Sequence, residues 1–186
     1  MIILGIVAEM SGGKTSAADY FETKYKAKRY GFAIIISDVL KRLYLPITRE
    51  TTSGISVILR QKFGNDLLAR AMAEDIKKDM NDDFIVVESI RREEDIQYLK
   101  EIDGFHLVSI KVDPKVRYER LIKRKEKADD ATKTYEEFLK DHQRETELSI
   151  LPLLDKAEFI IDNNGSLEEF YNKLDQIIAS IKKEAA

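Results

Sequence analysis

The sequence of 186 residues predicts a three-layer α/β/α fold, in which helices cover both faces of one parallel sheet. Short apolar runs rich in β-branched residues alternate with segments of helical periodicity, and the runs are apolar throughout, as strands buried on both faces are. A glycine-rich turn joins the first run to the first helix. Because no repeat, linker or low-complexity tract interrupts this alternation, we expect a single domain over residues 1–186.

The expected strands are the five apolar runs. They cover residues 1–7, 30–36, 84–87, 105–112 and 158–161. Caps and breakers mark the helices between them: Ser37 and Asp38 cap a helix that Pro46 ends, and Pro114 takes the first position of another. We expect helices over residues 14–25, 39–45, 55–63, 67–80, 93–100, 114–127, 135–148 and 167–181.

Residues 8–15 read Ala-Glu-Met-Ser-Gly-Gly-Lys-Thr and connect the first strand to the first helix. The two glycines let backbone N–H groups wrap around an anion, and the helix presents the positive end of its dipole. Lys14 adds a mobile charge, and the Thr15 hydroxyl adds a magnesium ligand. This is the pattern of a phosphate-binding loop, with Ala8 in place of its first glycine. The expected nucleotide ligands are Ser11, Gly12, Gly13, Lys14, Thr15 and Ser16.

Two carboxylates are expected near this loop, because ligands of parallel sheets bind beyond the carboxyl ends of the strands. Asp38 follows the second expected strand, where it can accept a proton from an attacking hydroxyl; its alternative role is in a helix cap. Glu88 ends the third strand and is expected to hold Mg²⁺ together with Thr15; its alternative is an exposed acid at the end of a strand.

The sequence also supplies the cations that phosphoryl transfer requires. Arg117, Arg120 and Arg124 share one face of the helix that follows Pro114. Arg144 comes from a later helix, so residues 117–148 can form a mobile lid that covers the phosphates. Among these cations, the expected catalytic residues besides Lys14 and Asp38 are Arg120, Arg124 and Arg144.

A second set of residues is expected to bind the acceptor. Arg91 follows the third strand and can clamp an acceptor phosphate in a bidentate fork. Arg49 and Arg60 lie between the second and third strands and are anion clamps if the acceptor binds there, although exposed helix arginines are the commoner case. The expected substrate-binding residues are Asp38, Lys41, Arg49, Arg60 and Arg91.

The composition excludes several classes of function. The formal net charge of −3 argues against broad nucleic-acid binding, and the absence of cysteine excludes disulfides, thiol catalysis and cysteine zinc sites. His106 and His142 are too few for a histidine-rich metal site, and we expect structural roles for both. The first apolar run is too short to span a membrane and has no basic leader. We therefore expect a cytoplasmic protein, monomeric or weakly self-associating, whose partner is a small molecule.

Together these motifs resemble the nucleoside monophosphate kinase-like branch of phosphate-loop enzymes, and within it the dephospho-coenzyme A kinases and related nucleotide kinases. The similar stretches are residues 11–15, 37–41, 63–69, 86–91 and 157–169, so the resemblance spans nearly the whole chain. It implies the P-loop NTPase fold, with a five-stranded parallel sheet of order 2-3-1-4-5, an acceptor-binding region over about residues 38–80, a helical lid and Mg-ATP as donor. It also implies that the loop containing Asn163 and Asn164 lies against adenine.

The leading interpretation is Mg-ATP-dependent phosphoryl transfer to a nucleotide-like acceptor. The first expected acceptor is dephospho-coenzyme A, whose ribose hydroxyl would use Asp38 as a base. The alternative is a (deoxy)nucleoside monophosphate, which brings its own phosphate nucleophile. The chain departs from the family at Ala8, at Glu88 in place of Asp and at Ser89 in place of Gly. The first two departures favour a second alternative, a regulator that binds ATP without transferring phosphate.

Overall fold

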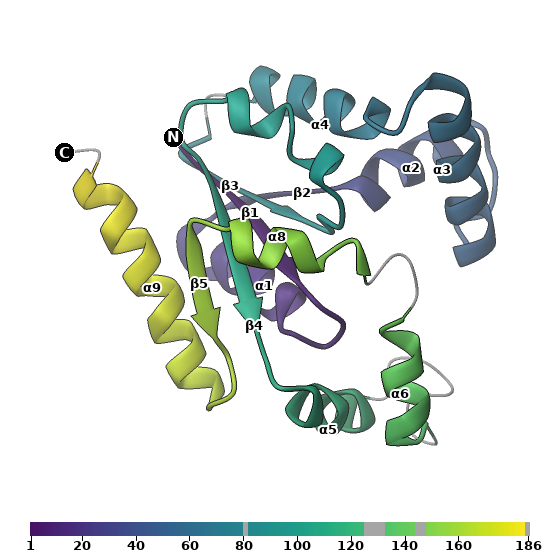
Figure 1. Cartoon of the computed structure of the whole chain (residues 1–186). Coiled ribbons are helices and arrows are strands. Elements are labelled where there is room, and N and C mark those ends of the chain that lie inside the picture. Colours follow the sequence, from purple (N-terminus) through teal and green to yellow (C-terminus); the bar gives the residue numbers. More distant parts are fainter. Residues whose placement is uncertain (80–81, 125–132, 144–147, 185–186) are drawn as a thin grey trace.

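A computed structural model of the chain contains a five-stranded sheet in which all neighbouring strands are parallel (Figure 1). The structure describes residues 1–79, 82–124, 133–143 and 148–184, with Arg49 described by its backbone alone. The strand order is β2-β3-β1-β4-β5, which confirms the expected order. The strands are β1 (Ile2–Ala8), β2 (Lys28–Gly31), β3 (Phe84–Glu88), β4 (Phe105–Lys111) and β5 (Phe159–Asp162).

Helices cover both faces of the sheet, which confirms the three layers (Figure 1). One face carries α1 (Lys14–Tyr25) and α9 (Leu167–Glu184), and the other carries α2 (Phe32–Arg42), α4 (Leu67–Lys78) and α8 (Leu151–Lys156). The remaining helices are α3 (Arg49–Phe63), α5 (Pro114–Arg124) and α6 (Tyr135–Asp141), with two 3-10 turns, η1 (Glu93–Asp95) and η2 (Leu99–Glu101). Within the described ranges, no helix is long and apolar enough to cross a bilayer.

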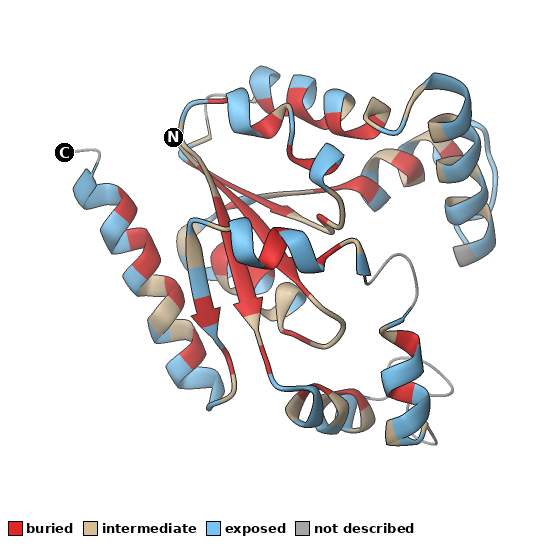
Figure 2. Cartoon of the chain, in the orientation of Figure 1, coloured by how far each residue is buried: buried red, intermediate tan, exposed pale blue. Residues whose placement is uncertain are grey.

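The core forms two apolar clusters, one on each side of the sheet (Figure 2). Residues of β1 alternate between the clusters because successive side chains of a strand point to opposite faces. Ile3 and Val7 join the cluster of α2, α4 and α8, whereas Leu4 and Ile6 join that of α1 and α9. The central position of β1 buries it from Ile3 to its last residue, Ala8. The glycine-rich loop therefore starts from the most enclosed strand of the sheet.

The second strand is shorter than the sequence predicts. β2 ends at Gly31, and residues 32–36, expected to be part of the strand, form the first turns of α2. Phe32, Ile36 and Leu40 are buried at four-residue intervals, whereas Ile34 is exposed. Burial at this helical spacing outweighs the strand propensity of the isoleucines. The expectation that a strand leads into a cap at residues 37 and 38 is therefore wrong, because both residues lie inside the helix.

Several helices also differ from their expected bounds. The segment expected as one helix over 93–100 forms η1 and η2 instead. α3 begins at Arg49 and not at residue 55, because Thr48 and Thr51 form a reciprocal capping box at its start. α8 is absent from the expected set; its six residues are too few to show a helical period. The expected helix 135–148 extends into residues outside the described ranges, and α6 ends at Asp141.

α3 projects from the body of the molecule beyond α2 (Figure 1). None of its described side chains is buried. Ile55 and Leu59 are half-buried against the cluster that contains α2 and α4, while Val57, Ile58 and Phe63 are exposed. The arm formed by α3 therefore contributes little to the main core.

The end of α1 allows a test of backbone strain. Lys26 closes this helix in the left-handed conformation, with φ of 58°, and its side chain is exposed. A Cβ in this conformation costs about 1–2 kcal/mol, and a glycine avoids this cost. Glycine also loses more chain entropy on folding, which offsets about 0.5–1 kcal/mol of that gain. Lys26→Gly should therefore raise the free energy of unfolding in chemical denaturation by about 0.5–1 kcal/mol. Lys26→Ala keeps the Cβ and should change little; equal gains in both variants would rule out strain as the cause.

Candidate nucleotide-binding site

The turn between β1 and α1 is closed by the close approach of its own backbone. Ser11 and Gly13 adopt positive φ angles of 58° and 106°. A Cβ on Gly12 would lie 2.9 Å from the Cβ of Ala8 and 3.0 Å from the carbonyl oxygen of Glu9. The methyl group of Ala8, where the motif usually has glycine, is therefore accommodated because residue 12 has no side chain.

Lys14 lies inside this turn. Its ammonium group donates to the carbonyl oxygens of Ala8 and, at 3.2 Å, Glu9. The Glu9 carbonyl also accepts from the backbone N–H of Gly12 at 3.1 Å. The Ser11 hydroxyl is buried and has no hydrogen-bond partner among the described residues. A buried polar group without a partner is costly, so this hydroxyl fits a site in which a phosphate oxygen completes the hydrogen bonding.

Glu88, the expected magnesium ligand, lies at the end of β3 and is held by β2. Its carboxylate is 2.7 Å from one guanidinium nitrogen of Arg29. The other terminal nitrogen of Arg29 pairs with Asp19 and Glu22 of α1, at 2.7 and 2.9 Å. The hydrogen bond with Glu88 is the largest cause that raises the pKa of Arg29. Thr15, at the start of α1, is exposed. Because α1 packs against β3, the structure brings the elements carrying both expected magnesium ligands together.

The described residues do not form a metal site of their own. Within the described ranges, no group of three histidine, aspartate or glutamate side chains forms a metal cluster. Mg²⁺ bound to nucleotide phosphates keeps several waters and needs only one or two protein ligands, which a threonine and a carboxylate can provide. Ser89 stands where the pattern of the dephospho-coenzyme A kinases has glycine. It adopts φ of 66°, so the left-handed turn after β3 is formed with serine.

Asn163 and Arg120 connect two distant segments to the loop. The buried Asn163 side chain donates to the carbonyl oxygen of Gly12 at 3.1 Å, and a Cβ on Gly13 would lie 2.7 Å from the same amide nitrogen. Arg120 of α5 donates to the carbonyl oxygens of Asn163 at 2.8 Å and Gly165 at 3.4 Å. Burial lowers the pKa of Arg120. The structure thus connects this expected catalytic arginine to the phosphate loop through Asn163.

Asn164 has a different role from Asn163. Its side-chain oxygen accepts from the backbone N–H of Asp113 at 2.8 Å, just before α5. Its amide group donates to Asp162 at 2.9 Å, and hydrogen bonds from the Asn164 backbone and side chain lower the pKa of that carboxyl. Asn164 therefore fixes the loop after β5 against the start of α5.

Arg117 and His142 belong to the site but are missing from the expected site residues. Arg117 is 3% exposed, and its guanidinium is 3.0 Å from the carboxylate of Glu9 in the loop. It also forms a hydrogen bond with His142, the residue after α6. The sequence places Arg117 on one helix face with Arg120 and Arg124, but it does not show that α5 buries Arg117 together with Leu121.

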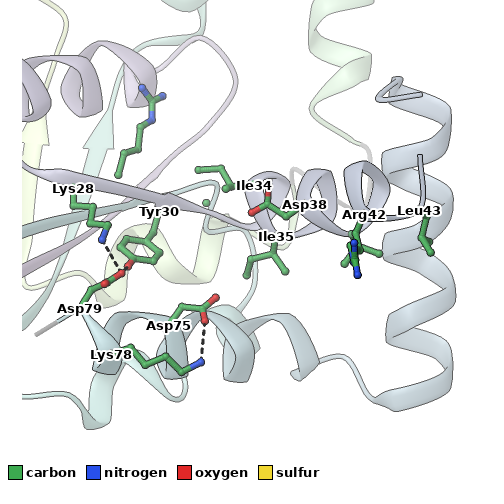
Figure 3. A pocket seen from close by; sticks show the side chains of 13 residues that line it. Lys28, Tyr30, Ile34, Ile35, Asp38, Arg42, Leu43, Asp75, Lys78 and Asp79 are labelled. Atoms are coloured by element: carbon green, nitrogen blue, oxygen red, sulfur yellow. Dashed lines mark hydrogen bonds and ion pairs between the residues drawn. The ribbon is translucent and has the colours of Figure 1, made fainter. Parts of the chain in front are cut away.

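Asp38 and Lys41 both belong to α2. They form an ion pair of 3.0 Å along α2, and each side chain is 63% exposed. Asp38 lines a groove of about 690 Å³ between α2, the edge strand β2 and the end of α4, with Asp75 and Lys78 on the α4 side (Figure 3). No residue of the loop 8–15 lines this groove. The expectation that Asp38 follows the end of a strand is wrong, because the helix begins at residue 32.

Arg60 links the α3 arm to the segment after β3. It is 3.4 Å from the carboxylate of Asp95, donates to the carbonyl oxygen of Asn65, and lies over the ring of Phe32 at 6.0 Å. The buried Asp95 also accepts from the backbone N–H of Arg91 at 2.9 Å. Arg60 therefore has a structural partner, which the sequence alone does not reveal.

The remaining expected cations are only partly described. Arg124 lies at the exposed end of α5. Arg144 and the side chain of Arg49 lie outside what the structure describes. Ser16, in the first turn of α1, is half-buried.

Comparison with known proteins assigns a family. No family model matches the chain. A UPF0200 protein of Methanocaldococcus jannaschii is 31% identical over 97% of this chain and 91% of its own length. The chain belongs to the UPF0200 family. Another UPF0200 protein, of Sulfurisphaera tokodaii, is 28% identical over 96% of this chain and 97% of its own length. One of Methanococcus maripaludis is 25% identical over 97% of this chain and 98% of its own length.

Solved structures show which fold this UPF0200 protein shares. Shikimate kinase from Bacteroides thetaiotaomicron superposes with a TM-score of 0.60 and 13% identity, covering 97% of this chain and 98% of that one. Dephospho-CoA kinase from Campylobacter jejuni gives a TM-score of 0.52 and 16% identity, covering 99% and 98%. The UPF0200 chain therefore has the fold of the P-loop kinases.

The contact between Gly13 and Asn163 can be tested by adding one methyl group. Gly13→Ala places a Cβ at a positive φ and against the Asn163 amide, so it should lower the free energy of unfolding by about 1–3 kcal/mol. Gly54→Ala is the control, because a Cβ there meets nothing within 4 Å and the residue lies in α3. The control should be neutral or stabilising by up to about 1 kcal/mol in the same denaturation experiment. Equal effects in the two variants would contradict the close packing at residue 13.

Proposed function

We propose that this UPF0200 protein is a Mg-ATP-dependent phosphotransferase that acts on a nucleotide-like small molecule. The position of Lys14 carries the proposal: its ammonium lies inside a glycine turn at the end of the central strand. The Ser11 hydroxyl of this loop has no partner among the described residues, and Arg120 donates to the carbonyl oxygen of Asn163, whose side chain binds the loop. The fold shared with two kinds of small-molecule kinase supports the assignment.

In this proposal each part of the site holds one part of the donor. The N–H groups of residues 11–16 and Lys14 bind the β- and γ-phosphates of ATP. Thr15 and Glu88 would hold Mg²⁺, which when bound neutralises charge on the phosphate oxygens. Arg120 stabilises the charge that develops on the transferred group, with Arg124 and Arg144 as further candidates from the lid. Asn163 positions the loop that faces adenine.

The reaction itself moves one phosphoryl group. An oxygen of the acceptor forms a bond to the γ-phosphorus, the bond from that phosphorus to the bridging oxygen breaks, and ADP leaves with the bridging oxygen. The position of Asp38 favours a nucleoside monophosphate as acceptor, because an ionised phosphate nucleophile needs no general base. Dephospho-coenzyme A, the first acceptor expected from the sequence, is then second, since its hydroxyl requires a base other than Asp38. Residues 38–80 are the proposed acceptor-binding region, and the proposed phosphate ligands are Arg49 within it and Arg91 after β3.

Removal of the Lys14 charge tests the assignment of the donor site. Lys14→Ala should abolish the rise in melting temperature that Mg-ATP causes in the wild type. Turnover should fall by about 10²–10³-fold, as it does when one preorganised donor is lost from a transition state. Lys183→Ala, at the exposed end of α9, is the charge-matched control and should keep both properties. A thermal shift that survives in Lys14→Ala would refute the loop assignment.

A panel of acceptors with labelled ATP tests the second half of the proposal. ADP release should depend on a nucleoside monophosphate, and Asp38→Asn should change its rate by less than about threefold, because no proton has to be removed. Dephospho-coenzyme A and shikimate complete the panel. A loss of about 10²–10⁴-fold in Asp38→Asn would instead identify a hydroxyl kinase with Asp38 as its base. ATP binding without acceptor-dependent ADP release would identify the regulator.

A further inference from the structure

The phosphate loop contains a carboxylate, that of Glu9. Glu9 lies between Ala8 and Met10, and its backbone carbonyl is the acceptor for both Lys14 and the Gly12 N–H. A negative charge on this residue opposes the binding of a polyphosphate, because like charges repel strongly at the short distances within a loop. A loop of this composition therefore needs a cation that compensates Glu9 without occupying the space of the ligand.

Arg117 meets both requirements. One of its terminal nitrogens is 3.0 Å from Glu9 Oε1, which neutralises the carboxylate. The other lies 3.5 Å from the carbonyl oxygen of Met10, the next residue of the loop. The Nε group donates to the carbonyl oxygen of Val112 at 3.1 Å, just before α5 begins. The guanidinium fork therefore fixes two successive loop residues relative to α5.

The surroundings of Arg117 keep it away from any ligand. The residue is 3% exposed, and its guanidinium carbon lies 5.7 Å from the centre of the Phe138 ring. His142 accepts a hydrogen bond from Arg117 through Nε2, because its Nδ1 lies 2.7 Å from the carbonyl oxygen of Phe138 and must carry the ring proton. Arg117 thus joins the loop to the end of α6 and acts through the loop rather than on the phosphates.

We propose that Arg117 is a positioning residue of the nucleotide site, which cancels the charge of Glu9 and holds residues 9 and 10 in the shape that binds a polyphosphate. This inference rests on the proposed function, since it assumes a polyphosphate ligand in the loop. It adds to that function a dependence of ATP affinity on a pair of residues that do not touch ATP. A purely structural arginine would lack this dependence, because its loss could not be repaired by changing the charge of Glu9.

A double-mutant cycle separates the two roles. Calorimetry on the full chain measures the dissociation constants of Mg-ATP and of inorganic triphosphate for the wild type, Arg117→Met, Glu9→Gln and the double variant. Arg117→Met keeps an apolar side chain in the buried site but leaves Glu9 uncompensated, so both ligands should bind about 10–100-fold more weakly. The double variant should bind within about threefold of the wild type, because the unpaired charge is gone. Steady-state kinetics should show the same change in the KM for ATP, with kcat at saturating ATP within about threefold of the wild type.

Two results would overturn the inference. One is an unchanged affinity in Arg117→Met; the other is a loss that Glu9→Gln fails to relieve, which is the result for a structural arginine. If Arg117→Met does not fold by circular dichroism, Glu9→Gln alone decides. It leaves Arg117 as an extra positive charge, so triphosphate should bind about 3–10-fold more tightly while adenosine, which has no phosphate, binds as before. An unchanged or weaker triphosphate affinity would then overturn it.

The wild-type measurement distinguishes this inference from the function on which it rests. If the wild type binds neither Mg-ATP nor triphosphate, the proposed function fails, and the inference fails with it. If the wild type binds both and the cycle shows no coupling between residues 9 and 117, the inference alone fails.

Discussion

The rest of the site depends on one constraint: residues 12 and 13 must be glycines, because there is no room for a Cβ at either position. A Cβ on either glycine would lie within 3 Å of Ala8 or of the Asn163 amide, so only this backbone can bring the ends of β1, α1 and β5 to one point. Their convergence encloses the Lys14 ammonium and places Arg120 beside the loop through the Asn163 carbonyl. Three segments far apart in the sequence thus meet because one short turn leaves room for them.

Arginine–carboxylate pairs recur where strands and loops meet. Arg29 holds Glu88, Arg60 holds Asp95, and Arg117 holds Glu9. Each pair joins residues from different elements, and the arginine fork fixes orientation as well as charge. Because breaking a buried pair leaves one charge uncompensated, these contacts constrain the site more strongly than exposed pairs such as Asp38–Lys41 do. Arg120 differs from these arginines, because its hydrogen bonds to the described residues go to the carbonyl oxygens of Asn163 and Gly165.

Local patterns were sufficient to predict the parallel sheet and the turn that contains Lys14, because strand runs and glycine spacing are encoded by neighbouring residues. The strand order followed instead from the resemblance to the nucleotide kinases. They failed at residues 32–36, where the same isoleucines suit a strand or a helix and only the position of the core decides. They also failed at Arg117 and Arg60, because nothing nearby in sequence distinguishes an arginine that meets a carboxylate across the fold from one in solvent. Short helices such as α8 depend on tertiary packing, which a local pattern does not contain.

The α3 arm has so little buried surface that its stability is distinct from that of the sheet. A helix held by half-buried contacts, one capping box and the Arg60–Asp95 pair opens at a fraction of the free energy that unfolds the core. Its amide hydrogens therefore exchange with solvent long before those of β1. Any molecule that binds to α3 must also order the arm. The free energy of this ordering offsets part of the interaction energy, so the apparent affinity is lower than the contacts alone imply.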